Sequence, residues 1–277
     1  MDPAAARRLC LCLIASTALA APARSASFTD DFESYAPGSF PSPTWSDVRL
    51  LAIPYAPVPS AQVVATTDAQ GNPTQALQTL DAVSASQGIY TAIAPASEHD
   101  LSGDLRVDRY GALGAGAAPN SDWPVQLGLS QILPGSDVCC FPTPQVGIYA
   151  STQTEGWRLY SIDSAGNASD IDLGATAVAG TWYRVDLDVD ALTGAVASRV
   201  FDIASGVLVV DRIDVIPGWT ATDFDAIAFF DGELSGAAGL GSLDNVSYSA
   251  VPEPGTLVCL SLGLVAASFA WRRPYAK

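Results

Sequence analysis

The amino-acid sequence predicts an all-β fold, a single two-sheet antiparallel β-sandwich flanked by an N-terminal signal helix and a C-terminal single transmembrane helix. About a dozen short segments alternate apolar and polar side chains with a period of two, the pattern of strands with one buried face. Gly, Asn, Asp and Pro separate these segments, and helical periodicity is scarce. The two helices are expected from uncharged apolar runs near the chain ends.

Residues 1–26 are predicted to be a secretory signal peptide. Arg7 and Arg8 form a basic start, and the 13 residues from Leu9 to Ala21 form the apolar segment. Small residues follow, with cleavage sites of the A-x-A type at Ala18–Ala20 and Ala21–Ala23. The chain is therefore expected to leave the cytoplasm through the Sec export machinery.

Residues 251–277 are expected to be a second targeting segment. Two prolines two positions apart cannot lie inside a helix or a central strand. The 16 residues Thr256–Trp271 that follow them carry no charge, slightly fewer than the roughly 17–25 of a spanning helix. Paired arginines after such a helix are expected to stay on the cytoplasmic side. The motif residues are Val251, Pro252, Glu253, Pro254, Arg272 and Arg273.

This arrangement closely resembles the PEP-CTERM sorting signal of Gram-negative bacteria that produce exopolysaccharide. The resemblance implies that the chain is the substrate of an exosortase, a membrane protease of the transpeptidase type. The enzyme would cut near Val251–Pro254 and discard the helix. The protein would then occupy the inner membrane transiently, through this helix alone, before reaching the cell surface or the extracellular matrix.

Residues 27–250 read as one domain, because no linker, charge block or repeat divides them. The predicted strands are Gln62–Thr66, Ala76–Leu80, Gly88–Ala94, Leu101–Tyr110, Val125–Ile132, Gln145–Ser151, Trp157–Asp163, Tyr183–Asp190, Ala195–Asp202, Leu208–Ile213, Ala226–Phe230 and Gly241–Ser249. Asp163–Asn167 and Leu192–Gly194 are predicted hairpin connections, because Gly and Asn supply the positive φ of tight turns.

The domain is strongly acidic once the targeting segments are set aside. Six of the 13 basic residues lie in those segments, which leaves seven, all arginine. Only Asp2 and Glu253 of the 29 acidic residues lie there, so the domain carries a net charge of −20. Nucleic acid and anionic lipid surfaces are poor partners for this charge. Calcium binding, or solubility in an acidic matrix, agrees with it.

Two stretches resemble concanavalin-A-like and laminin-G-like jelly rolls. One is Thr181–Asp190, in which Trp182 and Arg184 begin an outward polar face, with the meander that continues to Ile213. The other is the opening Phe28–Gly38 segment together with the closing Gly241–Tyr248 segment. The resemblance implies that the first and last strands lie side by side.

Structural calcium is the one cofactor expected. In related carbohydrate-binding sandwiches a calcium ion lies near the paired terminal strands, which here carry Asp30, Asp31 and Glu33 with Asp244 and Asn245. Carboxylate oxygens are the ligands that calcium prefers. The candidate ligands are Asp31, Glu33 and Asp244. The Asp163–Asp172 turn is a second place with suitable oxygens, and both sets have the alternative of bonding their own backbone.

Sugar binding would use tryptophans in loops, because a pyranose packs its C–H face on an aromatic ring. Trp123 and Trp219 have loop-like neighbours and are the candidates, with packing under a loop as the alternative. Trp157 and Trp182 begin strands and are expected in the core. Cys139 and Cys140 are adjacent; a vicinal disulfide, an intermolecular bridge and two free thiols are all compatible with an oxidising exterior.

No catalytic motif is evident, and no catalytic residue is assigned. The single histidine, His99, stands in a polar stretch and is expected to be a solvated surface residue. Asp186, Asp188 and Asp190 share one strand face and are expected to be its solvated side, with a carboxylate pair for glycoside chemistry as the alternative. We therefore expect an exported, non-catalytic surface or matrix protein that binds exopolysaccharide. The alternatives are a polysaccharide-active glycosidase or lyase and a purely structural coat protein.

Overall fold

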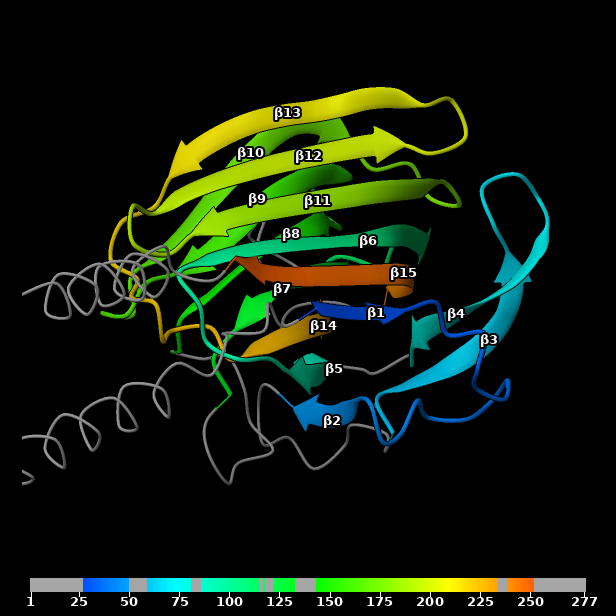
Figure 1. Ribbon diagram of the computed structural model, residues 1–277. Helices are drawn as coiled ribbons and strands as arrows, with labels where there is room; N and C mark the ends of the chain where they lie inside the picture. The colour runs from blue at the N-terminus through cyan, green and yellow to red at the C-terminus, as the bar shows by residue number, and fades with distance from the viewer. Residues whose placement is uncertain are drawn as a thin grey trace, which may run out of the picture. The chain divides into compact units, whose positions relative to one another are not determined.

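The computed structural model describes residues 27–49, 59–80, 86–114, 117, 122–132, 143–233 and 239–251. These residues form two antiparallel sheets and contain no helix. The two sheets lie one behind the other in Figure 1, with the larger sheet in front. The predicted two-sheet antiparallel sandwich is confirmed.

The larger sheet, sheet A, contains in spatial order β13 (Val207–Val215), β12 (Ala195–Asp202), β11 (Trp182–Asp190), β6 (Glu98–Arg109), β15 (Leu240–Val251), β4 (Pro73–Thr79) and β3 (Ala61–Thr67), with β1 (Ser27–Asp30) also paired to β15. Sheet B contains β10 (Ala168–Thr176), β9 (Gly156–Ile162), β8 (Gln145–Ser151), β7 (Asp122–Ser130), β14 (Ala226–Glu233), β5 (Ser86–Ala92) and β2 (Ser46–Arg49).

The core fills the space between the sheets. Alternate residues of β11, Val185 and Leu187 among them, point from sheet A into it. Leu127 and Phe229 enter it from β7 and β14 of sheet B. Burial of these side chains is the main favourable contribution to folding, at about 25 cal/mol per Å² of apolar surface. The period-two pattern of the sequence therefore determines which side chains of each strand point into the core and which point outward, where a ligand could reach them.

All twelve predicted strands are present, with bounds that differ by a few residues at most. β8 and β12 match their predicted ranges fully. Three strands were not predicted. β1 and β2 have four residues each, too few to show a period. β10 is an edge strand in which Ile171, Leu173 and Ala175 alternate toward the core, but its residues 168–172 fall in the Asp163–Asp172 stretch that was predicted to be a turn.

The last strand lies inside sheet A rather than at its edge. β15 has β6 on one side and both β1 and β4 on the other. β1 pairs with it from Ser27 opposite Ser249 to Asp30 opposite Val246. The side chains of Val246 and Tyr248 are buried in the core. The expected side-by-side placement of the first and last strands is confirmed.

The predicted signal helix and the predicted sorting helix lie outside the described residues. Within the described ranges, no helix has the length and apolar character needed to cross a membrane.

Candidate functional site

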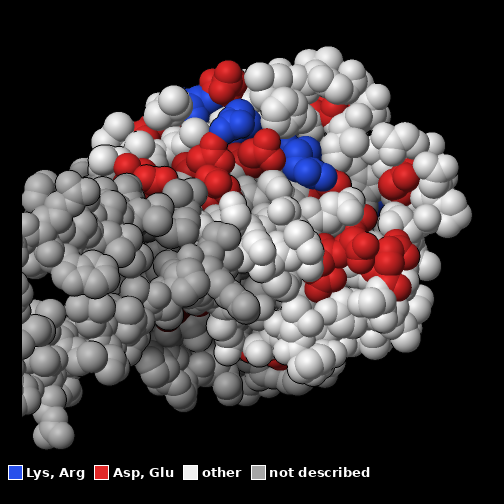
Figure 2. Space-filling model, in the orientation of Figure 1, with Lys and Arg blue, Asp and Glu red and all other residues white. Residues whose placement is uncertain are grey.

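The outward face of sheet A carries the main concentration of charge in the view of Figure 2. Arg184, Asp186 and Asp188 of β11 are half-buried on this face, whereas Val185 and Leu187 between them point into the core. This is the division predicted from the sequence. Acidic side chains and arginines gather over β6, β11 and β12 in Figure 2.

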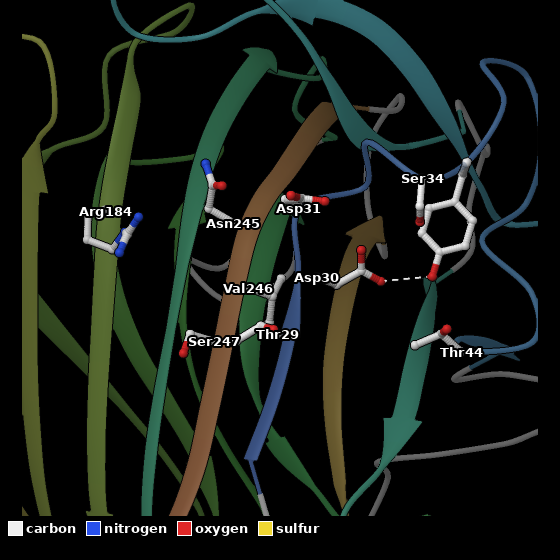
Figure 3. A pocket seen from close by; sticks show the side chains of 10 residues that line it. Thr29, Asp30, Asp31, Ser34, Thr44, Arg184, Asn245, Val246 and Ser247 are labelled. Carbon is white, nitrogen blue, oxygen red and sulfur yellow. Dashed lines mark hydrogen bonds between the residues drawn. The ribbon is translucent and has the colours of Figure 1, made fainter.

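A hollow of about 560 Å³ opens on this face where β1, β11 and β15 meet the chain that leads from β1 to β2. Figure 3 shows Arg184 coming from β11, Asn245 from β15 and Asp31 from just beyond β1. Hydroxyl groups of Thr29, Ser34 and Ser247 complete much of its lining. The hollow therefore offers carboxylate, amide, hydroxyl and guanidinium groups.

Two more hollows continue along the same face. One of about 360 Å³ is lined by Asp100, Ser102, Asp186, Asp188, Arg199 and Ser247. It shares Ser247 with the first hollow, so the two adjoin. A third, of about 220 Å³, shares Asp100 and Asp188 with the second and reaches Ile213 on β13. We call this row of three hollows the outer groove.

Two ion pairs hold the floor of the outer groove. Arg184 of β11 pairs with Asp104 of β6, and Arg199 of β12 pairs with Asp188 of β11. Asn245 of β15 donates a hydrogen bond from Nδ2 to the second oxygen of Asp104 at 2.8 Å. These contacts link four neighbouring strands across the groove, so its polar groups are held in place before any ligand arrives.

The groove contains more negative charge than its arginines neutralise. Asp188 lies directly opposite Asp100 in the β11–β6 register, and Asp190 lies opposite Glu98. Like charges in such cross-strand positions are destabilising. Burial raises the pKa of Asp186, against the opposing effect of Arg184 and Arg199. Burial likewise raises the pKa of Asp188, and the charge of Asp100 adds to the rise.

Asp244 is the most perturbed carboxyl group beside the first hollow. Burial raises its pKa to about 7, although the backbone N–H of Asn245, which donates to it at 2.7 Å, opposes the rise. The negative charges of Asp104, Glu33 and Asp31 add to the rise. The three predicted calcium ligands thus interact electrostatically around one buried carboxyl group.

The three predicted calcium ligands differ in their burial and in their hydrogen bonds. Glu33 accepts hydrogen bonds from Thr74 Oγ1 and from the backbone N–H of Gln75, both at 2.7 Å, which ties it to β4. Asp31 is exposed, and Asp244 is buried. Among the described residues, no group of three or more His, Cys, Asp or Glu side chains is placed to hold a metal ion. Calcium at this place would therefore need backbone or hydroxyl oxygens as well.

Asp30, which the sequence grouped with these ligands, organises the loop after β1. It accepts hydrogen bonds from the backbone N–H of Phe32 at 2.9 Å, from Tyr35 Oη at 3.0 Å and from Trp45 Nε1 at 2.9 Å. Three donors occupy its oxygens. Asp30 therefore shapes one wall of the first hollow, with three of its acceptor positions used inside the protein.

The second candidate set, in the Asp163–Asp172 turn, is also occupied by the protein itself. Asp163 accepts from the backbone and side-chain nitrogens of Asn167, both at 2.8 Å, inside the predicted hairpin. Asp170 and Asp172 lie on β10 and pair with Arg158, at 2.9 and 3.3 Å. The turn does not bring these oxygens to one point.

The two candidate tryptophans lie away from the outer groove. Trp219 is 6% exposed, packs against Phe224 and donates from Nε1 to the Ile162 carbonyl at 2.8 Å. This placement supports the packing alternative for Trp219. Trp123 is half-buried at the start of β7, with its ring edge-on to Tyr149 at 5.8 Å.

The position of His99 differs from the one expected from the sequence. The sequence predicted a solvated surface residue, but the ring is fully buried on β6. Its nitrogens bond to Tyr248 Oη at 2.9 Å and to the Ala96 carbonyl at 2.8 Å, and its ring packs edge-on against Phe224. The polar neighbours of His99 misled the prediction, because β6 begins at Glu98 and turns the histidine inward.

Cys139, Cys140, Pro252, Glu253, Pro254, Arg272 and Arg273 lie outside the described residues, and Val251 ends β15. The sequence of this region matches the family model described as the PEP-CTERM protein-sorting motif over residues 250–273. The predicted sorting motif is confirmed. The motif indicates that the chain is exported and sorted to the cell surface by an exosortase.

The fold is similar to several solved structures of low sequence identity. Lectin II from Ulex europaeus is 11% identical with a TM-score of 0.48, over 82% of this chain and 99% of the lectin. Peanut lectin is 13% identical with a TM-score of 0.48, over 83% and 98%. The carbohydrate-binding module CBM66 from Bacillus subtilis is 10% identical with a TM-score of 0.42, over 75% and 96%. No curated relative matches the chain.

Proposed function

We propose that this exported, exosortase-sorted protein is a non-catalytic module that binds extracellular polysaccharide along the outer groove. One observation carries the proposal. Three adjoining polar hollows, linked by Ser247 and then by Asp100 and Asp188, extend across the face of sheet A. A row of this kind fits several units of a polymer, whereas a single deep pocket fits one small molecule.

The chemistry of the lining supports a polyhydroxylated ligand. Sugar hydroxyl groups both donate and accept hydrogen bonds. Carboxylates such as Asp186 accept, guanidinium groups such as Arg184 donate, and serine and threonine hydroxyls do both. The excess of carboxylates favours a neutral or amino-bearing polysaccharide over a polyanionic one.

A blocking variant tests the proposal. Ser247 is exposed and lines both larger hollows, so Ser247→Trp would obstruct them while sheet A keeps its core. We expect this variant to lose retention on the host's own polysaccharide in a pull-down. Thr176→Trp, at an exposed position of β10 in sheet B, is the matched control and should bind as the unmodified protein does. Absence of binding by the unmodified protein would refute the proposal and favour a structural coat protein.

A glycosidase or lyase is the second candidate, because the pKa values of Asp186 and Asp188 are both raised. A raised carboxyl pKa is what a general acid requires. Asp186→Ala and Asp188→Ala separate the two functions. An enzyme would lose turnover of the polysaccharide with its fold retained, whereas a binding module releases no product before or after the change.

We also propose a structural calcium ion at the Asp31, Glu33 and Asp244 cluster. Burial, with the added repulsion from Asp104, Glu33 and Asp31, raises the pKa of Asp244 to about 7, and a divalent cation would favour the charged carboxylate. Calcium should then raise the melting temperature of the protein more than magnesium does, and Asp244→Asn should abolish that difference. Equal melting temperatures in calcium and in a chelator would refute this site.

For the sorting segment, we propose a transient stay in the inner membrane of a Gram-negative host. The segment Thr256–Trp271 has only 16 residues, which is marginal for a permanent anchor. Intact mass measurement of the protein from its host should find a chain that ends near Val251–Pro254. Recovery of the complete helix and of Arg272–Arg273 would contradict removal.

A further inference from the structure

β13, the outermost strand of sheet A, exposes an unusual amount of apolar surface. Five of the eight large apolar side chains that are exposed among the described residues belong to this strand: Val207, Leu208, Val209, Ile213 and Val215. Ile213 is 73% exposed and Val215 is 69% exposed. Among the described strands only β12 pairs with β13, so the backbone on its other side is an open edge.

Open edges of this length are usually protected against pairing with other chains. Here the protection is partial. Arg212 points to the inner side, where it pairs with Asp214 at 2.8 Å and donates to the Asp172 carbonyl of β10 at 3.0 Å. The two charges are opposite in sign and two residues apart, so they repel a partner only in some registers. Between them lies Ile213, on the outward face beside Ala197 of β12.

We propose that β13 pairs antiparallel with β13 of a second copy of this chain, about a twofold axis at Ile213. In this register Ile213 lies against its own counterpart. Arg212 lies opposite the partner subunit's Asp214, and Asp214 lies opposite the partner subunit's Arg212. Directly opposite side chains in an antiparallel pair share one face of the sheet. The pairing thus covers the most exposed apolar side chain and forms two cross-strand ion pairs.

Charge selects this register over its neighbours. Moving the axis to Arg212 places that arginine opposite its own counterpart. Moving it to Asp211 or to Asp214 places two carboxylates together. Only the axis at Ile213 matches opposite charges among these four choices, since residues at equal distances from it are Arg212 and Asp214. A self-complementary strand of this kind specifies a second copy of the chain rather than an unrelated partner.

The association is expected to depend on salt, because each domain carries a net charge of −20. Salt screens the long-range repulsion between the copies more than it weakens contacts inside a covered interface. Dimer formation should therefore increase between low and physiological ionic strength. This proposal does not depend on the proposed polysaccharide binding. The dimer would place two outer grooves on one continuous sheet.

A cysteine at the axis tests the register. Directly opposite Cα atoms of an antiparallel pair lie about 4.5–5.5 Å apart, which a disulfide can bridge. In a background with all five native cysteines (Cys10, Cys12, Cys139, Cys140 and Cys259) replaced by serine, purified Ile213→Cys protein should form a covalent dimer on mild oxidation. Leu192→Cys is the control, since Leu192 is 64% exposed in the turn between β11 and β12. Equal cross-linking of the two variants would overturn the proposal.

A charge exchange tests the partner residues. Arg212→Asp places like charges opposite each other and should shift the sedimentation profile to monomer. The double variant Arg212→Asp, Asp214→Arg restores opposite charges across the axis and should restore the dimer. Ile213→Asp should abolish it, with the circular dichroism spectrum unchanged. A protein that sediments as a monomer at every salt concentration, or whose dimer survives Ile213→Asp, would refute the pairing.

Discussion

The buried His99 makes the stability of the domain sensitive to acid. The ring is neutral when Nε2 donates to the Ala96 carbonyl and Nδ1 accepts from Tyr248, and both bonds are present. Burial lowers the pKa of His99 below its usual value of 6.5, although the Ala96 carbonyl and the charge of Asp100 oppose this. The unfolded chain therefore takes up a proton at a higher pH than the folded one, and stability falls as the pH drops below about 6.5.

We predict that this loss is specific to the histidine. Between pH 7.5 and pH 5 the melting temperature of the unmodified protein should fall relative to that of His99→Gln, which cannot take up the proton. Comparing the two proteins cancels the titration of other groups. Tyr248→Phe keeps the ring and should retain the acid sensitivity. Parallel curves for the unmodified protein and His99→Gln would contradict this account.

Asp244 has the opposite pH dependence. Its pKa is raised from 3.8 to about 7, so the folded state holds a proton that the unfolded state has already lost. Its contribution to stability is therefore lost as the pH rises from about 4 to about 7. In calcium-free buffer, Asp244→Asn should be more stable than the unmodified protein at pH 8, by at most about 4 kcal/mol. Urea unfolding at pH 8 and pH 4.5 measures this, and the gain should shrink at the lower pH.

At the residue scale the sequence could predict side-chain direction better than side-chain partners. Alternation along β11 placed Arg184, Asp186 and Asp188 on one face, because a strand permits no other arrangement. Asp104, the partner of Arg184, lies on β6, which is distant in sequence. Arg199 lies on the neighbouring strand β12 and reaches Asp188 because of the register in which the two strands pair. The Arg184–Asp104 pair is not encoded locally, and the predicted hairpin turn at Leu192–Gly194 does not by itself give the register that brings Asp188 to Arg199, so the groove could not be predicted.

Among the elements, two hairpin loops repeat one design. Asp68–Asn72 joins β3 to β4 and Asp163–Asn167 joins β9 to β10. In each, the aspartate accepts from the backbone and side chain of the asparagine, and a glycine has φ near +84°, at Gly71 and Gly166. Hydrogen bonds from Asn72 and Asn167 hold the pKa values of Asp68 and Asp163 below their usual range.

Gly166→Ala should destabilise the domain by about 1 kcal/mol, because a Cβ at positive φ costs about 1–2 kcal/mol. Gly71→Ala should have a similar effect in the equivalent loop. A Cβ at Gly71 meets no atom within 4 Å, so backbone strain is the only cause there. Urea unfolding measures both, with the exposed Ala165→Ser as control. An unchanged midpoint for both glycine variants would contradict the assigned cause.

Strand length decided which elements could be predicted. β6 and β11 have 12 and 9 residues, long enough for the period of two to be evident. β1 and β2 have four residues each and form through pairing with their neighbours rather than through a pattern of their own, and pairing is not encoded locally. β10 is the exception to the rule of length: Ile171, Leu173 and Ala175 alternate toward the core, but the first half of the strand coincides with the predicted Asp163–Asp172 turn.

For the whole molecule, the placement of β15 predicts where the domain can be shortened. Val246 and Tyr248 of β15 are buried, and β15 joins β6 to β1 and β4. Removing residues 252–277 should leave the melting temperature unchanged. Ending the chain at Gly239 should unfold it, because sheet A then loses its connection. Circular dichroism melts of the two truncated proteins decide this, and a folded chain without β15 would contradict the assigned role.

The pairing of β15 with β1 also determines when sheet A can be completed during export. Ser27, the first residue of β1, finds its partner only when Ser249 has crossed the membrane, almost the whole domain later. Pairings across such long separations are slow to form. Until β15 is in place, sheet A has no strand between β6 and β4. The core side chains that Val246 and Tyr248 of β15 would cover are then exposed to water. Because the sorting motif begins where β15 ends, the last strand of the domain and the sorting motif leave the cytoplasm together.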